Sequence, residues 1–242
     1  MAVLIKRSMN RTIQKGILFY LLLVLFALIG VGYGAQVQQV YPDLRVWSIT
    51  TVGIMLIALP LVALQAQAGL PPIWPDHSKQ PFYFLAPVTI GLVFGLLDYI
   101  IIECILTQQP HTSLPPYTQP FPYSIFLYGS GAFEIEVFYR LLPITLGGLF
   151  LQYYKKGAYG EPGFWVLALL TALREPLEQW PTGPTWFVTY ALLTGFGMNF
   201  LQAIYLKRFG FWSALLIRLG HYLVWHIGNG VLIEMALQNS GK

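Results

Sequence analysis

The chain has 242 residues, of which 56% are hydrophobic and only 10% are charged, and its formal net charge at pH 7 is +4. Soluble domains carry about 25% charged residues, so this composition excludes a protein that covers its whole surface with solvated side chains. The basic residues lie at the ends of apolar stretches rather than in one patch, which argues against nucleic-acid binding and predicts an integral membrane protein in contact with the lipid bilayer.

Seven apolar stretches can cross a bilayer as helices, because one crossing needs about 20 residues. In chain order they are 16–34, 46–65, 82–106, 123–154, 163–180, 185–206 and 210–237. The expected fold class is therefore all-α, a polytopic bundle of about seven transmembrane helices. Proline-rich segments at 65–81 and 107–122 interrupt the helices. The fourth stretch exceeds one crossing, so we expect it to tilt, to kink near Pro143 or to project from the membrane.

Basic residues predict the orientation, since cytoplasmic loops are enriched in Lys and Arg. A cytoplasmic N-terminus leaves only Arg45 and Lys242 outside. It places the following residues inside: Lys6, Arg7, Arg11, Lys15, Lys79, Lys155, Lys156, Lys207 and Arg208. We therefore expect the C-terminus outside a plasma or inner membrane. The first stretch is long for a signal peptide, so we expect it to be retained as an anchor.

Arginines inside the predicted spans indicate a polar centre in the bundle. Arg140, Arg174 and Arg218 lie in the fourth, fifth and seventh stretches, at similar depths from the cytoplasmic ends. A charge at the centre of a bilayer costs about 2.5–3.5 kcal/mol on insertion scales. We therefore expect all three to turn inward and to meet acidic side chains.

Acidic side chains are spaced to meet these arginines. Glu136 lies four residues before Arg140, and Glu178 lies four after Arg174, so each pair shares a helix face. We predict a single intramembrane network of Glu136, Arg140, Arg174, Glu175, Glu178, Arg218 and His221. The alternative is several separate pairs, each within one helix. Asp98 is a second candidate for the interior site.

Two motifs in residues 123–235 resemble the CPBP family, which comprises intramembrane metalloproteases of the CAAX-prenyl-protease and bacteriocin-processing type. They are "EIEVFYR" in the fourth stretch and "LKRFGFWSALLIRLGHYLVWH" near the last. The resemblance divides the chain into an N-terminal membrane region of three spans (1–122) and a CPBP-protease-like core of about four spans (123–242).

The resemblance implies a site in which a glutamate and two histidines activate a water molecule for peptide hydrolysis, but the match is partial. Glu136 and Arg140 match the second glutamate and the arginine of the first family motif, whereas Ile135 stands at the position of the expected base. The histidine of the second motif falls on Arg174 or Glu175, and that of the last motif falls on Arg218, with Tyr222 at its asparagine. A guanidinium group cannot bind a metal cation.

These departures favour a non-catalytic protein without a cofactor, acting as a binding, assembly or accessory subunit for other membrane proteins or a hydrophobic ligand. The alternative is an active CPBP-type endopeptidase with a rearranged zinc site. Its catalytic residues would be Glu136, Arg140, His221 and His226. A second alternative is a transporter, because buried arginine and glutamate suit an anion or proton path.

Overall fold

The computed structural model of the protein describes residues 2–40, 44–73, 81–107 and 119–240, and every regular element in these ranges is helical. The helices are α1 (Ala2–Val37), α2 (Ile49–Met55), η1 (Leu56–Ala58), α3 (Leu59–Leu64), α4 (Pro81–Tyr99), η2 (Ile100–Ile105), α5 (Tyr123–Glu136), η3 (Val137–Leu141), α6 (Leu142–Tyr153), η4 (Tyr154–Gly157), α7 (Gly160–Glu178), α8 (Thr185–Phe209), α9 (Phe211–Tyr222), η5 (Leu223–Gly228) and α10 (Asn229–Ser240). The all-α prediction is confirmed.

Each predicted apolar stretch corresponds to one helical segment, but not every segment has the length and composition of a membrane span. Three helices in the described ranges do: Arg11–Val37, Pro81–Ile105 and Thr185–Phe209. Ile49–Leu64 is a shorter apolar helix. These helices are compatible with an integral membrane protein, and the count of seven spans stays a prediction.

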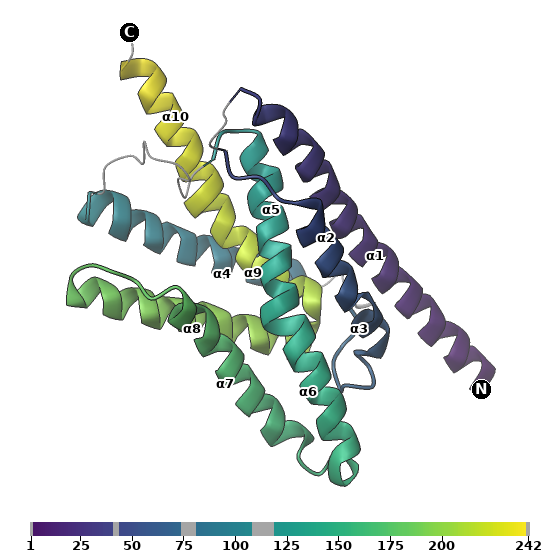
Figure 1. Cartoon of the computed structure of the whole chain (residues 1–242). Coiled ribbons are helices and arrows are strands. Elements are labelled where there is room, and N and C mark those ends of the chain that lie inside the picture. Colours follow the sequence, from purple (N-terminus) through teal and green to yellow (C-terminus); the bar gives the residue numbers. More distant parts are fainter. Residues whose placement is uncertain (1, 41–43, 74–80, 108–118, 241–242) are drawn as a thin grey trace.

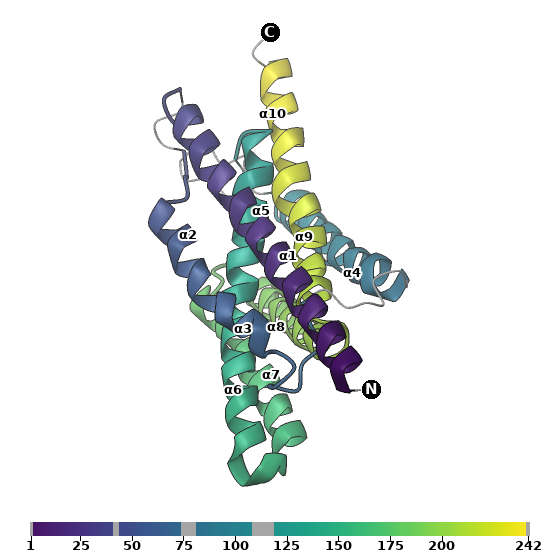
Figure 2. The same cartoon turned by 90° about the vertical axis from the view of Figure 1, so that its right-hand side faces the viewer.

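The helices run in two main directions (Figure 1). The α5–α6 and α9–α10 segments follow the long direction of the molecule and α1 runs obliquely beside them, whereas α4 and α8 lie across them. The N-terminus and the turn between α6 and α7 lie toward one end, and the C-terminus lies at the other (Figure 2). Lys79 and Lys242, which enter the orientation count, lie outside the described residues, as do residues 74–80 and 108–118 of the two proline-rich segments.

Helix boundaries differ from the apolar stretches where polar residues also form helix. The first helix begins at Ala2 rather than at residue 16, because hydrophobicity marks depth in a bilayer and does not limit helix length. At the C-terminal end of α7, Pro176, which cannot donate a backbone hydrogen bond, lies in the last turn, and the helix ends at Glu178.

Among the described residues, three helical segments contain a π-helical turn, namely η2, η3 and η5. A π-helical turn adds one residue to the regular α-helical repeat, and such turns are frequent at functional sites. Turn η3 ends at Leu141, directly before the first turn of α6, which contains Pro143. The chain therefore continues as one helical rod through this proline.

Helices α4 and α9 approach each other so closely that glycine is required at the contact. A Cβ atom on Gly91 would lie 2.0 Å from the Ile217 carbonyl oxygen, and one on Gly220 would lie 2.6 Å from that of Val88. Small residues permit this kind of backbone contact between membrane helices. Because α4 and α9 come from the two regions predicted at 1–122 and 123–242, those regions share one packed bundle.

Candidate functional site

Arg218 on α9 is the centre of a group of buried charged side chains. Its side chain is 1% exposed. Nη1 and Nη2 donate to the two carboxylate oxygens of Glu175 at 2.8 and 2.6 Å, and Nε donates to Glu136 Oε1 at 3.2 Å. A carboxylate that accepts two parallel hydrogen bonds from one guanidinium orients that guanidinium and also neutralises its charge. Arg218 is therefore held between α5 and α7.

A second guanidinium lies beside the first. Arg140 in η3 is fully buried, and its Nη1 is 3.2 Å from Glu136 Oε1, so one glutamate oxygen lies between two arginines. Arg140 also donates to Asn199 Oδ1, which accepts from Arg218 Nη2 at 2.8 Å as well. Gln202 Oε1 accepts from the same Arg218 nitrogen at 3.2 Å.

We call Glu136, Arg140, Glu175 and Arg218, with the amides Asn199 and Gln202, the buried charge cluster. Its two carboxylates and two guanidinium groups balance in formal charge. Burying ions is costly unless each is paired and hydrogen-bonded, so the members depend on one another. The cluster joins α5, η3, α7, α8 and α9, and it fixes how these elements pack.

Arg174 and Glu178, which the sequence predicts as members of the same network, lie outside it. Their side chains are 49% and 47% exposed, and Arg174 Nε donates to Glu178 Oε1 at 2.7 Å. Tyr139 joins them, since its hydroxyl donates to Glu178 and its ring lies 4.3 Å from the guanidinium carbon. Successive helix residues are about 100° apart, so Glu175 turns inward while Arg174 and Glu178 share an outer face. A single network of all seven residues is therefore wrong.

His221 lies one turn after Arg218, but its partner comes from α4 rather than from the buried charge cluster. Its Nε2 is 2.7 Å from Asp98 Oδ2, and the Tyr190 hydroxyl donates to Asp98 Oδ1 at 2.8 Å. The close contact of α4 with α9 allows this pairing, because a Cβ on Gly95 would lie 2.7 Å from the His221 carbonyl oxygen. We call Asp98, Tyr190 and His221 the Asp98 site.

The described side chains do not fit a zinc ion. His226 stacks on Tyr128 with ring centres 4.3 Å apart, and its ring centre is 6.4 Å from that of His221 at an interplanar angle of 88°. A catalytic zinc site needs about three nitrogen, sulfur or oxygen ligands. No group of three or more His, Cys, Asp or Glu side chains in the described ranges could hold a metal ion.

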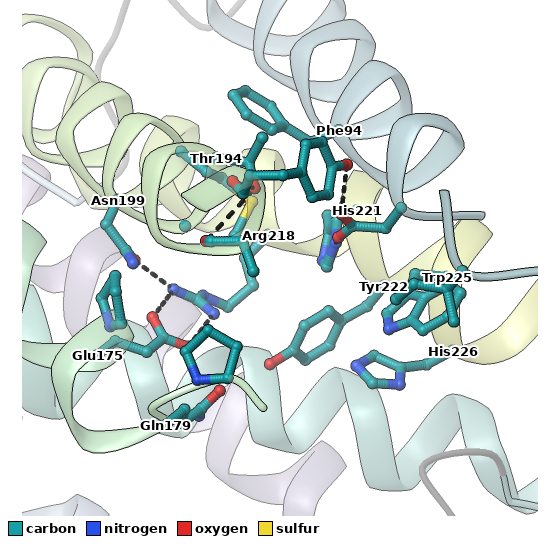
Figure 3. Close-up of a pocket in the computed structure, with 18 of the residues that line it drawn as sticks. Phe94, Glu175, Gln179, Thr194, Asn199, Arg218, His221, Tyr222, Trp225 and His226 are labelled. Atoms are coloured by element: carbon teal, nitrogen blue, oxygen red, sulfur yellow. Dashed lines mark hydrogen bonds and ion pairs between the residues drawn. The ribbon is translucent and has the colours of Figure 1, made fainter. Parts of the chain in front are cut away.

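A cavity of about 260 Å³ lies between the two groups of polar residues (Figure 3). Glu175, Asn199 and Arg218 line one side, where the dashed contacts of Figure 3 join them. Asp98 and His221 line it as well. Aromatic side chains form much of the remaining wall, namely Phe94, Phe187, Tyr190, Tyr222 and Trp225. The cavity thus combines charged groups with ring faces.

Three polar residues of these sites are not among the sequence predictions. Asn199 and Gln202 lie three residues apart in an apolar helix, so they share one face, and that spacing is the signal that could have found them. Tyr190 carries no such signal, because tyrosine is common near the ends of membrane helices.

The sequence matches no protein-family model, and neither a curated protein nor a solved structure matches the chain. The resemblance to the CPBP family therefore stays a prediction from the two motifs. Function has to be argued from the site itself.

Proposed function

We propose that this protein is a multi-pass membrane protein with a CPBP-protease-like core that binds rather than hydrolyses. In this proposal, arginine, glutamate and histidine side chains replace the metal and the base of the family. The protein would act as a binding, assembly or accessory subunit for other membrane proteins or a hydrophobic ligand. The observation that carries the proposal is the bidentate ion pair between Arg218 and Glu175 in the buried charge cluster.

The chemistry of the paired residues supports a non-catalytic centre. Arg218 takes the position of the last motif's histidine in the family register, and its guanidinium has five donors but no lone pair for a metal. Glu136 is ion-paired with both arginines through one oxygen, and Ile135 stands at the position of the base. A general base must reach the water molecule that it activates. In the proposed centre, Glu136 holds the two arginines instead of activating water.

The arrangement of the helix ends supports the proposed orientation, with the N-terminus in the cytoplasm and the C-terminus outside. The N-terminus and the α6–α7 turn, where Lys155 and Lys156 lie, are at the same end of the molecule (Figure 1). Leu18, Leu22 and Leu25 on α1 are more than half exposed, which suits contact with lipid in a plasma or inner membrane.

Metal analysis and a cleavage assay test the non-catalytic proposal. The full chain, purified in detergent with zinc in the buffers, is expected to retain far less than one zinc ion per chain by mass spectrometry. It is expected to cleave a quenched fluorescent prenylated peptide no faster than Glu136→Gln does. Stoichiometric zinc, together with cleavage that is lost in both Glu136→Ala and His221→Ala, would contradict the proposal.

Photo-cross-linking tests the binding role. A photoreactive amino acid at Phe94, inside the cavity, is expected to give a discrete adduct in native membranes. The same group at Leu22, on the exposed face of α1, is expected to give lipid adducts only. Identical patterns from the two positions would count against a binding cavity.

A further inference from the structure

Asp98 lines the cavity and has no lysine or arginine partner in the described part of the chain. Its side chain is 24% exposed, and its partners in the described part of the chain are the Tyr190 hydroxyl and the His221 ring. Each carboxylate oxygen accepts one hydrogen bond from these groups. Whether the Asp98 site carries a net charge therefore depends on the protonation of His221.

The two ring nitrogens of His221 have different surroundings. Its Nε2 faces Asp98, whereas its Nδ1 is buried and has no hydrogen-bond partner within the described ranges. In a neutral ring, Nε2–H donates to the carboxylate and Nδ1 carries only a lone pair. With a neutral His221 ring, the negative charge of Asp98 stays on its carboxylate.

The nearby arginines do not cancel this charge either. Arg140 and Arg218 are matched by Glu136 and Glu175, and the Arg218 side chain is only 1% exposed. The buried charge cluster and the Asp98 site together carry two positive and three negative formal charges. A negative charge in an apolar surrounding is stabilised by a cation, and the cavity has room for one.

The other walls of the cavity suit an organic cation. Phe94, Tyr190 and Trp225 are among the aromatic residues that line the cavity, and aromatic rings attract ammonium groups. At about 260 Å³ the cavity is near the lower limit for small-molecule sites. We propose that it binds a small hydrophobic amine in its protonated form, with the ammonium group on Asp98 and the apolar part against the rings. This inference rests on the proposed binding function and names its ligand class.

Calorimetry with the full chain in phosphatidylcholine nanodiscs tests this inference. The probes are 2-phenylethylammonium, the neutral 2-phenylethanol and the anion phenylacetate. We expect saturable binding of the ammonium ion, about tenfold or more weaker binding of the alcohol, and none of the anion, since a partly buried charge pair outweighs a neutral hydrogen bond. Equal affinity for the ammonium ion and the alcohol would overturn the proposal, as would displacement of the ammonium ion by equimolar sodium.

Two variants locate the site. Asp98→Asn keeps the shape of the side chain and is expected to weaken ammonium binding by about tenfold or more. Glu103→Gln is the matched control, because Glu103 follows on the same helical segment, does not line the cavity and accepts from Asn229 at 2.9 Å. Unchanged binding in Asp98→Asn contradicts the proposal. The probe series on the parent protein decides the matter even if Asp98→Asn does not fold.

The outcomes separate the two proposals. If no ammonium ion binds while zinc and cleavage stay absent, the ligand class is wrong and the non-catalytic function stands. If stoichiometric zinc and cleavage are found, the proposed function is wrong, whether or not the ammonium ion binds.

Discussion

Replacing Arg218 with methionine is expected to lower the free energy of unfolding by about 3–5 kcal/mol, the usual loss when one partner of a buried ion pair is removed. Glu136 and Glu175 would then share only Arg140 as a cation, which leaves one excess negative charge in the interior. Unfolding in mixed micelles, followed by circular dichroism, measures the loss.

A second substitution tests whether charge balance is the cause. The double variant Glu175→Gln/Arg218→Met keeps Glu136 and Arg140 as a neutral pair, so it is expected to be more stable than Arg218→Met alone. Arg174→Met is the matched control, because it removes an exposed guanidinium and is expected to cost at most about 1 kcal/mol. Equal losses for Arg174→Met and Arg218→Met would refute the central role of the cluster.

Replacing Gly91 with alanine is expected to destabilise the protein by about 1–3 kcal/mol, as overpacking of an interior does. The added Cβ would lie 2.0 Å from the Ile217 carbonyl oxygen, a backbone atom that no side-chain rotation can move. Helices α4 and α9 must then separate, and the contact of Asp98 with His221 is lost with them. The same micelle unfolding assay measures the change.

Gly197→Ala is the control for this prediction. Gly197 lies in α8, and a Cβ there would meet no atom within 4 Å. Alanine is a better helix former than glycine by about 1 kcal/mol, so this variant is expected to be neutral or slightly more stable. A loss at Gly197 as large as that at Gly91 would show that close packing is not the cause.

The helices follow from the sequence because the distribution of apolar residues along the chain is a local property. Each of the seven apolar stretches predicts one helical segment, and only the ends are displaced. The crossing of α4 and α8 over the other helices does not follow, because it depends on which helix faces meet (Figure 1). The contact at Gly91 and Gly220 is of this kind, since it joins residues far apart in the chain.

The site could be predicted in part for the same reason. The pairing of Glu136 with Arg140 is encoded by their spacing within one helical segment. The equal spacing of Arg174 and Glu178 also yields a pair, but spacing cannot tell whether its shared face turns inward. Neighbouring helices decide that, and they also bring Asp98 to His221.

The π-helical turns change the directions in which side chains point around the helices that carry the site. Turn η3 contains Arg140, η2 begins two residues after Asp98, and η5 begins two residues after His221. One inserted residue rotates everything beyond it by about 100° relative to an uninterrupted α-helix. In each of these helical segments, the side chains after the π-helical turn therefore face a different direction from those that an uninterrupted α-helix would present. Asn229, which follows η5, donates to Glu103, whereas α9, which precedes η5, carries Arg218 of the buried charge cluster and His221 of the Asp98 site.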